Sequence, residues 1–218
     1  MTSGWSLPDG PRSAMVKPTS ITPVTEPVAT RQPDAIRRCP WCGSDPLYVR
    51  YHDEEWGKLV SDDQRMFEFL TLESAQAGLS WLTILRRREA YRQAFADFDV
   101  RVVAEFSDDD IQRLLTDSGI IRNQAKIRAA VTNAQAFLAV QQEFGSFCAY
   151  LRGWLADGRP IVNYWQDDSE IPATTELAEQ IAADLKRRGF RFFGPTICYA
   201  HLQAVGLVND HLVDCAFR

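Results

Sequence analysis

NQAKIRAAVTNAQAFLAVQQEF, residues 123–144, holds the longest helical pattern of this chain and decides its fold class. Apolar side chains recur three and four positions apart along it, so that one face carries Ile127, Ala130, Val131, Ala134, Phe137 and Leu138. This spacing is the period of an amphipathic α-helix. It predicts a long helix, beginning near Asn123, whose apolar face packs into the core.

Helical patterns also dominate on both sides of this segment. Ser61 is the predicted N-cap of a helix that reaches about Ala77, where Gly78 can end it. Caps and periodicity predict further helices over residues 81–95, from a capping box at Ser107 and Asp110 to near Gly119, from Ser146 to Gly158, from Thr174 or Thr175 to Gly189, and from Pro195 to Gly206. Residues 39–57 are predicted as a loop, and alternating strand patterns are nearly absent. The sequence therefore predicts an all-α fold.

Length and composition limit the domain organisation. With 218 residues, 45% of them hydrophobic, the chain can bury one good core. Residues 1–36 are rich in Pro, Ser and Thr and have no hydrophobic period, so we expect a disordered tail there and one domain at 37–218. No run approaches the ~18 apolar residues of a membrane span, and the N-terminus lacks the apolar core of a signal peptide. We therefore expect a cytoplasmic protein with no membrane partner.

The charge balance does not by itself favour nucleic acid as a partner. The net charge is −5, and residues 37–218 carry 21 basic side chains against 26 acidic ones. Local basic clusters can still neutralise phosphates on an acidic protein. Two such clusters are Arg86-Arg87-Arg88 with Arg92, and Arg122 with Lys126 and Arg128. Each cluster taken alone is more often a solvated helix face.

Four potential metal ligands lie at the two ends of the expected domain. Cys39 and His52 are near its start, and His211 and Cys215 are near its end, with the three-residue spacing that lets two ligands on one helical turn reach one ion. Two thiolates and two imidazoles would complete a tetrahedral Zn²⁺ shell that stabilises structure and leaves no open position. Such an ion would close a loop of about 170 residues. Four unrelated buried side chains explain the spacing equally well.

Aromatic residues are concentrated around one carboxylate between positions 48 and 81. They are Tyr48, Tyr51, Trp56 and Trp81, and the carboxylate is Glu73. Aromatic faces and a carboxylate are what recognition of a nucleobase requires, above all of a cationic base. Glu73 follows an apolar run, where an unpaired charge would be costly to bury. The residues alone favour the plainer interpretation, a solvent-facing carboxylate beside an aromatic core cluster.

Five long segments of the chain, in order, resemble the 3-methyladenine DNA glycosylase I family, the constitutive alkylation-repair glycosylases of bacteria. The resemblance covers essentially all of residues 37–218. The segments are RCPWCGSDPLYVRYHDEEWG (38–57), LESAQAGLSWLTIL (72–85), DSGIIRNQAKI (117–127), RGFRFFGPTICY (188–199) and GLVNDHLVDC (206–215).

The resemblance implies a monofunctional DNA glycosylase of the helix-hairpin-helix superfamily. Such an enzyme acts on double-stranded DNA carrying alkylated bases, hydrolyses the N-glycosidic bond of 3-methyladenine and releases the free base without strand cleavage. The resemblance also implies a structural zinc, which clasps the two ends of the domain through Cys39, His52, His211 and Cys215. Cys42 forms a Cys-x-x-Cys pair with Cys39 and is the alternative ligand. We expect the protein to be a monomer.

The resemblance assigns the aromatic group to binding of the excised base. Glu73 falls on the carboxylate that binds the base and is the candidate catalytic residue, and Tyr51 and Trp81 fall on the aromatics that stack against it. Trp56 and Tyr48 line the same pocket. Alkylation at N3 makes adenine cationic and already weakens its bond to the sugar. We therefore expect Glu73 to favour the charged base, held between Tyr51 and Trp81.

The segment from Gly119 to Lys126 is the candidate DNA contact. Its backbone amides, together with Arg122 and Lys126, could bind phosphates at a helix N-terminus. Ile121 stands where the superfamily usually has a second glycine, and the nearest acid beyond the hairpin is Glu143, so no catalytic aspartate is assigned.

Two other kinds of protein fit parts of this pattern. A non-enzymatic, zinc-stabilised helical module that binds nucleic acid would need no aromatic cage. A zinc hydrolase would need an open coordination position at the metal.

Overall fold

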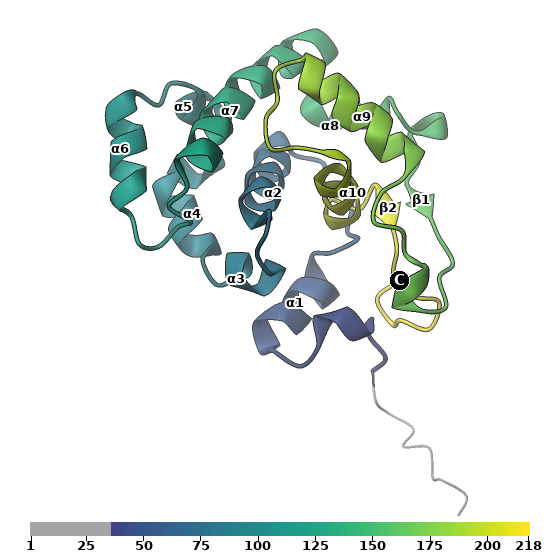
Figure 1. Cartoon of the computed structure of the whole chain (residues 1–218). Coiled ribbons are helices and arrows are strands. Elements are labelled where there is room, and N and C mark those ends of the chain that lie inside the picture. Colours follow the sequence, from purple (N-terminus) through teal and green to yellow (C-terminus); the bar gives the residue numbers. More distant parts are fainter. Residues whose placement is uncertain (1–35) are drawn as a thin grey trace, which may run out of the picture. The chain divides into compact units, whose positions relative to one another are not determined.

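The computed structural model describes residues 36–218, so the tail predicted at 1–36 lies, apart from Ile36, outside the described residues. This part of the chain is mostly helical, as predicted (Figure 1). Its α-helices are α1 (Pro46–Glu54), α2 (Asp63–Gln76), α3 (Trp81–Leu85), α4 (Arg88–Ala94), α5 (Val100–Ala104), α6 (Asp108–Thr116), α7 (Gln124–Phe144), α8 (Phe147–Arg152), α9 (Glu176–Arg187) and α10 (Pro195–Ala204).

Short elements complete this part of the chain. The 3-10 turns are η1 (Pro40–Cys42), η2 (Ala96–Phe98), η3 (Ala156–Gly158) and η4 (Asp168–Glu170). Two short strands, β1 (Ile161–Val162) and β2 (Val208–Asn209), pair in parallel with Ile161 opposite Val208. None of the helices described is long and apolar enough to span a membrane.

The long helix predicted at 123–144 is confirmed as α7. The side chain of Asn123 accepts a hydrogen bond from the backbone N–H of Lys126, which caps the first turn. Gly145, with a φ of 83°, ends the helix in the left-handed conformation that glycine adopts easily. Of the predicted apolar face only Leu138 is half-buried, and the rest is buried.

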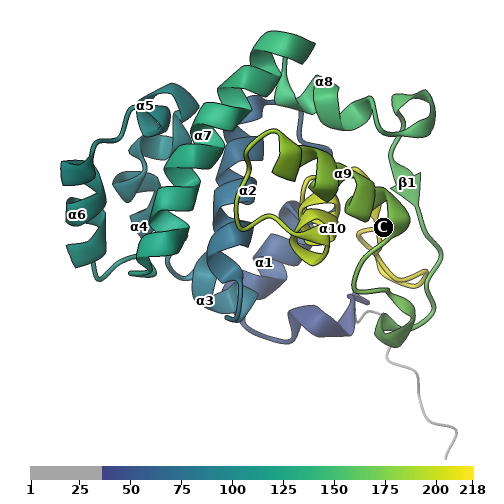
Figure 2. The same cartoon turned by 45° about the horizontal axis from the view of Figure 1, so that its top comes forward.

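α2 is the central helix of the molecule (Figures 1 and 2). Residues 66–75 are all buried, because α3, α7, α8 and α10 pack around the helix. A helix that is buried on every side normally carries apolar residues throughout. This one carries two glutamates, Glu68 and Glu73, and their surroundings differ.

Glu68 is the centre of a buried ionic network. Its carboxylate accepts hydrogen bonds from Arg88 Nε at 2.8 Å and Arg92 Nε at 2.9 Å, and it also pairs with Arg65. Arg65 and Arg88 further pair with Glu55. A buried carboxylate is tolerated when charged donors satisfy it in this way.

The basic cluster expected at 86–88 and 92 is therefore largely engaged within the protein. Besides Arg88 and Arg92, Arg86 pairs with Asp45 at 2.7 Å. The guanidinium of Arg87 donates to the carbonyl oxygens of Ser118 at 2.8 Å and Gly119 at 3.1 Å.

The prediction of one helix over 81–95 is wrong in one respect, because the structure has two helices there, α3 and α4. The chain is interrupted at Arg86 and Arg87, which lie between the helices. Arg87 donates to the carbonyl oxygens of the loop between α6 and α7, while its neighbour Arg88 donates to buried Glu68. These tertiary bonds override a helical preference that the local sequence indicates correctly.

Other differences arise from cap residues. The loop predicted at 39–57 contains α1, because Asp45 caps the backbone N–H groups of Leu47 and Tyr48 and Pro46 occupies the first turn. Asp62, and not Ser61, caps α2. The helix after Ser146 ends at Arg152, well before Gly158, because Gly153 already stops it.

Candidate functional site

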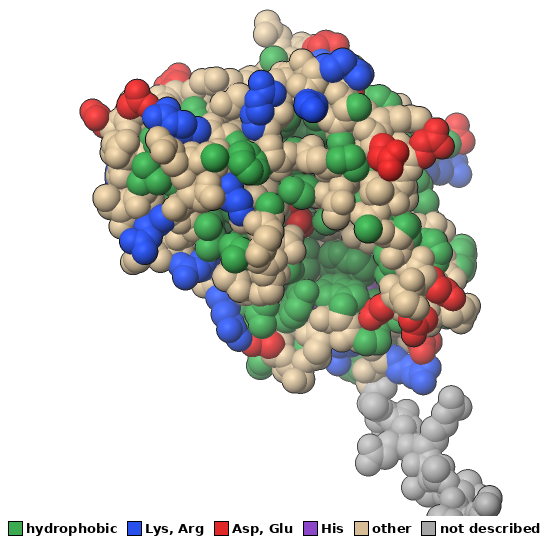
Figure 3. Space-filling model, in the orientation of Figure 1, with side chains coloured by type: hydrophobic (Ala, Val, Ile, Leu, Met, Phe, Trp, Pro, Cys, Tyr) green, Lys and Arg blue, Asp and Glu red, His purple; other side chains and the backbone are tan. Residues whose placement is uncertain are grey.

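A cavity of about 340 Å³ lies between α1, the C-terminal end of α2, the start of α3, η4 and α10. In the orientation of Figure 1, Figure 3 shows it as a hollow lined by hydrophobic side chains. The structure brings together there all five residues assigned by resemblance to base binding. The lining residues are Trp41, Tyr48, Tyr51, Trp56, Glu73, Gln76, Trp81, Asp168, Ile171, Ala200 and Gln203.

Glu73 lines this cavity, is buried, and has no hydrogen-bond or salt-bridge partner among residues 36–218. Its exposed fraction is 4%. Burial raises the pKa of its carboxyl group to about 8, and no neighbouring group among the described residues offsets that effect. The group is therefore mainly protonated at neutral pH in the free protein. A positive charge placed beside it would lower its pKa and restore the carboxylate.

The aromatic rings form a corner and not the predicted sandwich. The ring centroids of Tyr51 and Trp81 are 5.4 Å apart, with an angle of 56° between the planes. A flat base between two parallel rings would need about 7 Å, twice the contact distance of about 3.5 Å. The rings are this close because Tyr51 is also anchored in the core, against Phe69.

The sequence reasoning missed Trp41, which joins the cavity to the metal-ligand cluster. Its ring lies 4.8 Å from that of Trp56, 5.2 Å from that of Tyr48 and 5.2 Å from the imidazole of His52. The signal was present, because Trp41 lies between two cysteines in the first segment of the resemblance.

Asp168 and Gln203 were also missed, and no local pattern points to them. Asp168 lies in η4, and its Oδ1 atom is buried without a hydrogen-bond partner among the described residues. Burial and the neighbouring Asp167 raise the pKa of Asp168. The Gln203 amide donates from Nε2 to Asp210 Oδ2 at 2.6 Å, and Asp210, fully buried, holds it in place at the cavity wall.

The four predicted metal ligands meet in one buried cluster. The ligand atoms of Cys39, His52, His211 and Cys215 all lie within 4.8 Å of one another. Cys215 Sγ is 3.5 Å from His52 Nε2 and 3.4 Å from His211 Nδ1, and Cys39 Sγ is 3.6 Å from His211 Nδ1. Tetrahedral Zn²⁺, with bonds of about 2.3 Å to sulfur and about 2.05 Å to nitrogen, separates such atoms by about 3.5–3.6 Å. The donor set therefore fits zinc.

The surroundings of the cluster orient its ligands. His52 Nδ1 lies 2.7 Å from Asp53 Oδ1, and His211 Nε2 lies 3.2 Å from the Trp56 carbonyl oxygen. Such contacts on the second nitrogen fix the tautomer that binds metal. Burial lowers the pKa of His211 to about 4 and keeps its imidazole neutral, as a ligand must be.

Two expectations about the cluster change. His211 and Cys215 lie in the irregular segment after β2, so they do not share the helical turn that their spacing suggested. Cys42, the alternative ligand, lies outside the cluster, and its thiol faces the Gly43 carbonyl oxygen at 3.9 Å.

Residues 117–123 connect α6 to α7 and form the hairpin. Two of its backbone N–H groups donate hydrogen bonds to side chains of the protein. The N–H of Gly119 donates to Asp117 at 2.7 Å, and the N–H of Ile121 donates to the Tyr91 hydroxyl at 3.2 Å. Lys126 donates to the carbonyl oxygens of Ala75 at 2.9 Å and Ala77 at 2.6 Å.

These bonds give Lys126 a structural role, since its ammonium group caps the C-terminal end of α2. Arg122, by contrast, has an exposed side chain. A phosphate contact at this hairpin stays a prediction, and the structure leaves Arg122 as its most accessible cation.

Known proteins resemble the whole of the described region. A sequence model of the methyladenine glycosylase family matches residues 41–218. The DNA-3-methyladenine glycosylase of Haemophilus influenzae is 45% identical to this chain over 178 residues, which are 82% of this chain and 96% of that protein. DNA-3-methyladenine glycosylase 1 of Escherichia coli is 44% identical over 180 residues, which are 83% of this chain and 96% of that protein.

A solved structure agrees with these matches. A variant of 3-methyladenine DNA glycosylase I, crystallised in complex with 3-methyladenine, has a TM-score of 0.80 and 39% identity, covering 82% of this chain and 96% of that one. The match in sequence and the match in structure extend over the same region. The chain belongs to the methyladenine glycosylase family.

Proposed function

We propose that this protein is a DNA glycosylase that hydrolyses the N-glycosidic bond of 3-methyladenine in alkylated double-stranded DNA and releases the free base. The observation that carries the proposal is the carboxyl group of Glu73, buried in an aromatic cavity without a partner among the described residues. A cationic ligand would gain most from such a group, because its charge would restore the carboxylate and pair with it. The related enzymes bear this activity in their names, and one related structure holds 3-methyladenine.

The cavity would select the base by its charge. Alkylation at N3 makes adenine cationic, so the base departs as a neutral molecule and the bond to the sugar is weak before binding. When the cation enters, the pKa of Glu73 falls and the ionised carboxylate pairs with the amino edge of the base. The corner formed by Tyr51 and Trp81 adds cation–π attraction on one face. Normal adenine, which is neutral, would leave Glu73 protonated and would gain no ion pair with it.

The same geometry supports hydrolysis without strand cleavage. Glu73 lies buried inside the cavity, so a base can reach it only after its nucleotide has left the duplex. Strand-cleaving glycosylases attack the sugar with an amine, and none of the residues described as lining the cavity is a lysine. We therefore propose that water completes the reaction and that the enzyme is monofunctional.

We further propose that the Cys39, His52, His211 and Cys215 cluster holds a structural zinc ion. Four protein ligands leave no position for water, so the metal would supply stability and no step of the reaction. The ligand residues also shape the cavity, because the ring of Trp56 lies 4.6 Å from His211 and its carbonyl oxygen faces the same imidazole. We propose that the protein acts as a monomer in the cytoplasm.

Methylated duplex DNA provides the direct test. The protein should release 3-methyladenine from it, identified by chromatography and mass spectrometry, and leave the sugar–phosphate strand uncut. Free 3-methyladenine should also quench tryptophan fluorescence, because Trp41, Trp56 and Trp81 line the cavity. Binding of DNA with no base release at any protein concentration would favour the non-enzymatic module instead.

A further inference from the structure

Phe192 is held in an unusual conformation at the protein surface. It lies in the loop between α9 and α10, and its φ of 51° is in the left-handed region that side-chain-bearing residues rarely occupy. Its exposed fraction is 43%, whereas the next residue, Phe193, is buried. Neither hydrophobic burial nor backbone preference accounts for this arrangement.

A buried amide fixes the loop in this form. Asn133, on α7, is 1% exposed. Its Nδ2 donates to the carbonyl oxygen of Arg191 at 3.0 Å, and its Oδ1 accepts from the N–H of Arg191 at 2.7 Å. Both peptide groups of Arg191 are thereby fixed on α7. The following residue is turned outward, and its ring cannot reach the core that receives Phe193.

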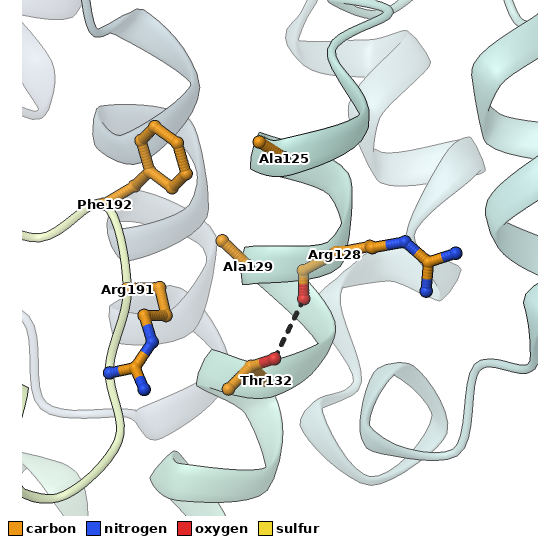
Figure 4. A pocket seen from close by; sticks show the side chains of 6 residues that line it. All are labelled: Ala125, Arg128, Ala129, Thr132, Arg191 and Phe192. Atoms are coloured by element: carbon orange, nitrogen blue, oxygen red, sulfur yellow. Dashed lines mark hydrogen bonds between the residues drawn. The ribbon is translucent and has the colours of Figure 1, made fainter.

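The exposed ring forms one wall of a groove, which we call the Phe192 groove, of about 320 Å³. Figure 4 shows Phe192 and Arg191 on one side and the α7 residues on the other, where Ala125 and Ala129 leave room in front of the ring. Arg128 extends from the far side of α7. The groove is lined by Ala125, Arg128, Ala129, Thr132, Arg191 and Phe192, which include two arginines and no acid.

One of these arginines has a competing partner. Arg128 pairs with Asp108 at 3.0 Å, with side-chain exposures of 48% and 81%. Such an exposed pair is weak and exchanges readily for another anion. Arg191 is exposed and, apart from the neighbouring Phe190 carbonyl oxygen, has no side-chain hydrogen bond in the described region.

The groove lies on the same face as the cavity that contains Glu73. The loop carrying Phe192 crosses the front of the molecule in Figure 1, and the cavity opens on that face in Figure 3. The loop leads directly into α10, which brings Ala200 to the cavity wall. Lys and Arg side chains are spread over the upper and left parts of this face, and Asp and Glu side chains lie mostly at its right side and its upper left edge.

We propose that the Phe192 groove binds the DNA duplex beside the nucleotide whose base enters the cavity. The Phe192 ring packs against deoxyribose or base edges, and Arg128 and Arg191 pair with phosphates on either side of α7. An apolar side chain flanked by cations is the combination that proteins use to hold deformed DNA. This inference rests on the proposed glycosylase function and adds to it a second DNA-binding surface, on the first turns of α7 next to the hairpin at 117–123.

The test compares Phe192→Ala with Phe144→Ala, which removes a similarly exposed phenylalanine (41%) at the other end of α7. Binding to an alkylated duplex is measured by fluorescence anisotropy at several salt concentrations. We expect Phe192→Ala to raise the Kd for DNA about tenfold, as loss of a stacking or wedge residue does. Phe144→Ala should leave it unchanged. Quenching by free 3-methyladenine should be the same in both variants, because neither residue lines the cavity.

A second pair of variants tests the arginines. Arg128→Gln with Arg191→Gln should reduce the salt slope of DNA binding by about two, roughly one for each phosphate that an arginine no longer neutralises. The control is Arg159→Gln with Arg187→Gln, two exposed arginines outside the groove, and should leave the slope as it is.

The outcomes separate this inference from the proposed function. If the wild-type protein excises 3-methyladenine while the Phe192→Ala and double-arginine variants bind DNA like their controls, the groove does not bind DNA. A concentration-dependent dimer that Phe192→Ala abolishes, with DNA binding unchanged, would also overturn the inference and assign the groove to a second copy. Absence of excision by the wild-type protein is a failure of the proposed function itself.

Discussion

The metal-ligand cluster and the cavity that contains Glu73 adjoin each other through Trp41 and Trp56. They differ in whether their buried polar groups have hydrogen-bond partners. In the cluster, Asp53 and the Trp56 carbonyl oxygen contact the second nitrogens of His52 and His211. In the cavity, the Glu73 carboxyl group has no donor, and Trp81 Nε1 and Asp168 Oδ1 are buried without partners among the described residues. Satisfied buried groups stabilise a fold, whereas unsatisfied ones cost free energy. The cavity therefore contains buried polar groups that a ligand could satisfy.

The largest effect should come from breaking the cluster. Cys39→Ser and His211→Ala should each remove the zinc and lower the free energy of unfolding by about 3 kcal/mol or more, because metal binding contributes directly to folding. Elemental analysis and chemical denaturation are the measurements, and one zinc per molecule is expected in the wild type. Cys42→Ser is the matched control and should retain the ion. A folded, active protein that contains no zinc would contradict this view of the cluster.

The unpartnered carboxyl group of Glu73 predicts that the free energy of unfolding falls as the pH rises. The Glu73 pKa is about 8 in the folded protein against an ordinary value of 4.5, so the folded state holds the additional proton between these values. Stability contributed by this group is present below pH 4.5 and is lost as the pH rises through 8. At pH 9, Glu73→Gln should therefore be more stable than the wild type by about 2–4 kcal/mol. The difference should shrink toward about pH 5.

Denaturation of both proteins across this pH range measures the effect. Glu89→Gln, at an exposed position of α4, is the control and should change stability little at any pH. Equal stability of Glu73→Gln and wild type at both ends of the range would mean that Glu73 is solvated or paired in solution.

Glu73→Gln, which should stabilise the protein at high pH, should weaken its binding of 3-methyladenine. Glu73→Gln keeps a hydrogen-bond acceptor but loses the charge, so affinity for free 3-methyladenine should fall by about 1.5–3 kcal/mol, the contribution of a charged hydrogen bond. Excision from DNA should fall by a smaller factor, because base extrusion and exclusion of water remain. Fluorescence titration and single-turnover kinetics separate the two effects. Unchanged base affinity with complete loss of turnover would make Glu73 a catalytic base and not a recognition residue.

The smallest effects concern the hairpin and the first turn of α7, where the structure indicates different roles for Arg122 and Lys126. Arg122→Ala should weaken binding to all DNA sequences and reduce the salt slope by about one. Lys126→Ala should instead lower stability by about 1 kcal/mol, because its ammonium group satisfies the Ala75 and Ala77 carbonyl oxygens at the end of α2. Salt-dependent binding and thermal denaturation of both variants would distinguish these roles. A salt slope that responds to Lys126→Ala alone would reverse the assignment.

Sequence reasoning was most accurate where the cause of structure is local. The period of α7, the capping box at Ser107 and the first-turn Pro195 each depend on residues within one or two turns, and all three predictions are confirmed. Residue types and spacing indicated the four metal ligands, the resemblance favoured them over Cys42, and the structure places them in one cluster without Cys42. The roles of the cavity residues stay predictions, although the structure brings those residues together.

The features that could not be predicted depend on contacts between groups that are distant in sequence. The break between α3 and α4 follows from partners of Arg87 and Arg88 that lie 31 and 20 residues away. The same periodic pattern puts Glu68 and Glu73 on one buried helix, but packing adds Arg88 and Arg92 to the local pair of Glu68 with Arg65 and gives Glu73 no partner in the described region. Local patterns therefore predicted most of the helices, and residue types with the resemblance identified the candidate side chains of the site. Their protonation and availability were decided by the folded structure, because desolvation and hydrogen bonding depend on which neighbours three-dimensional packing provides.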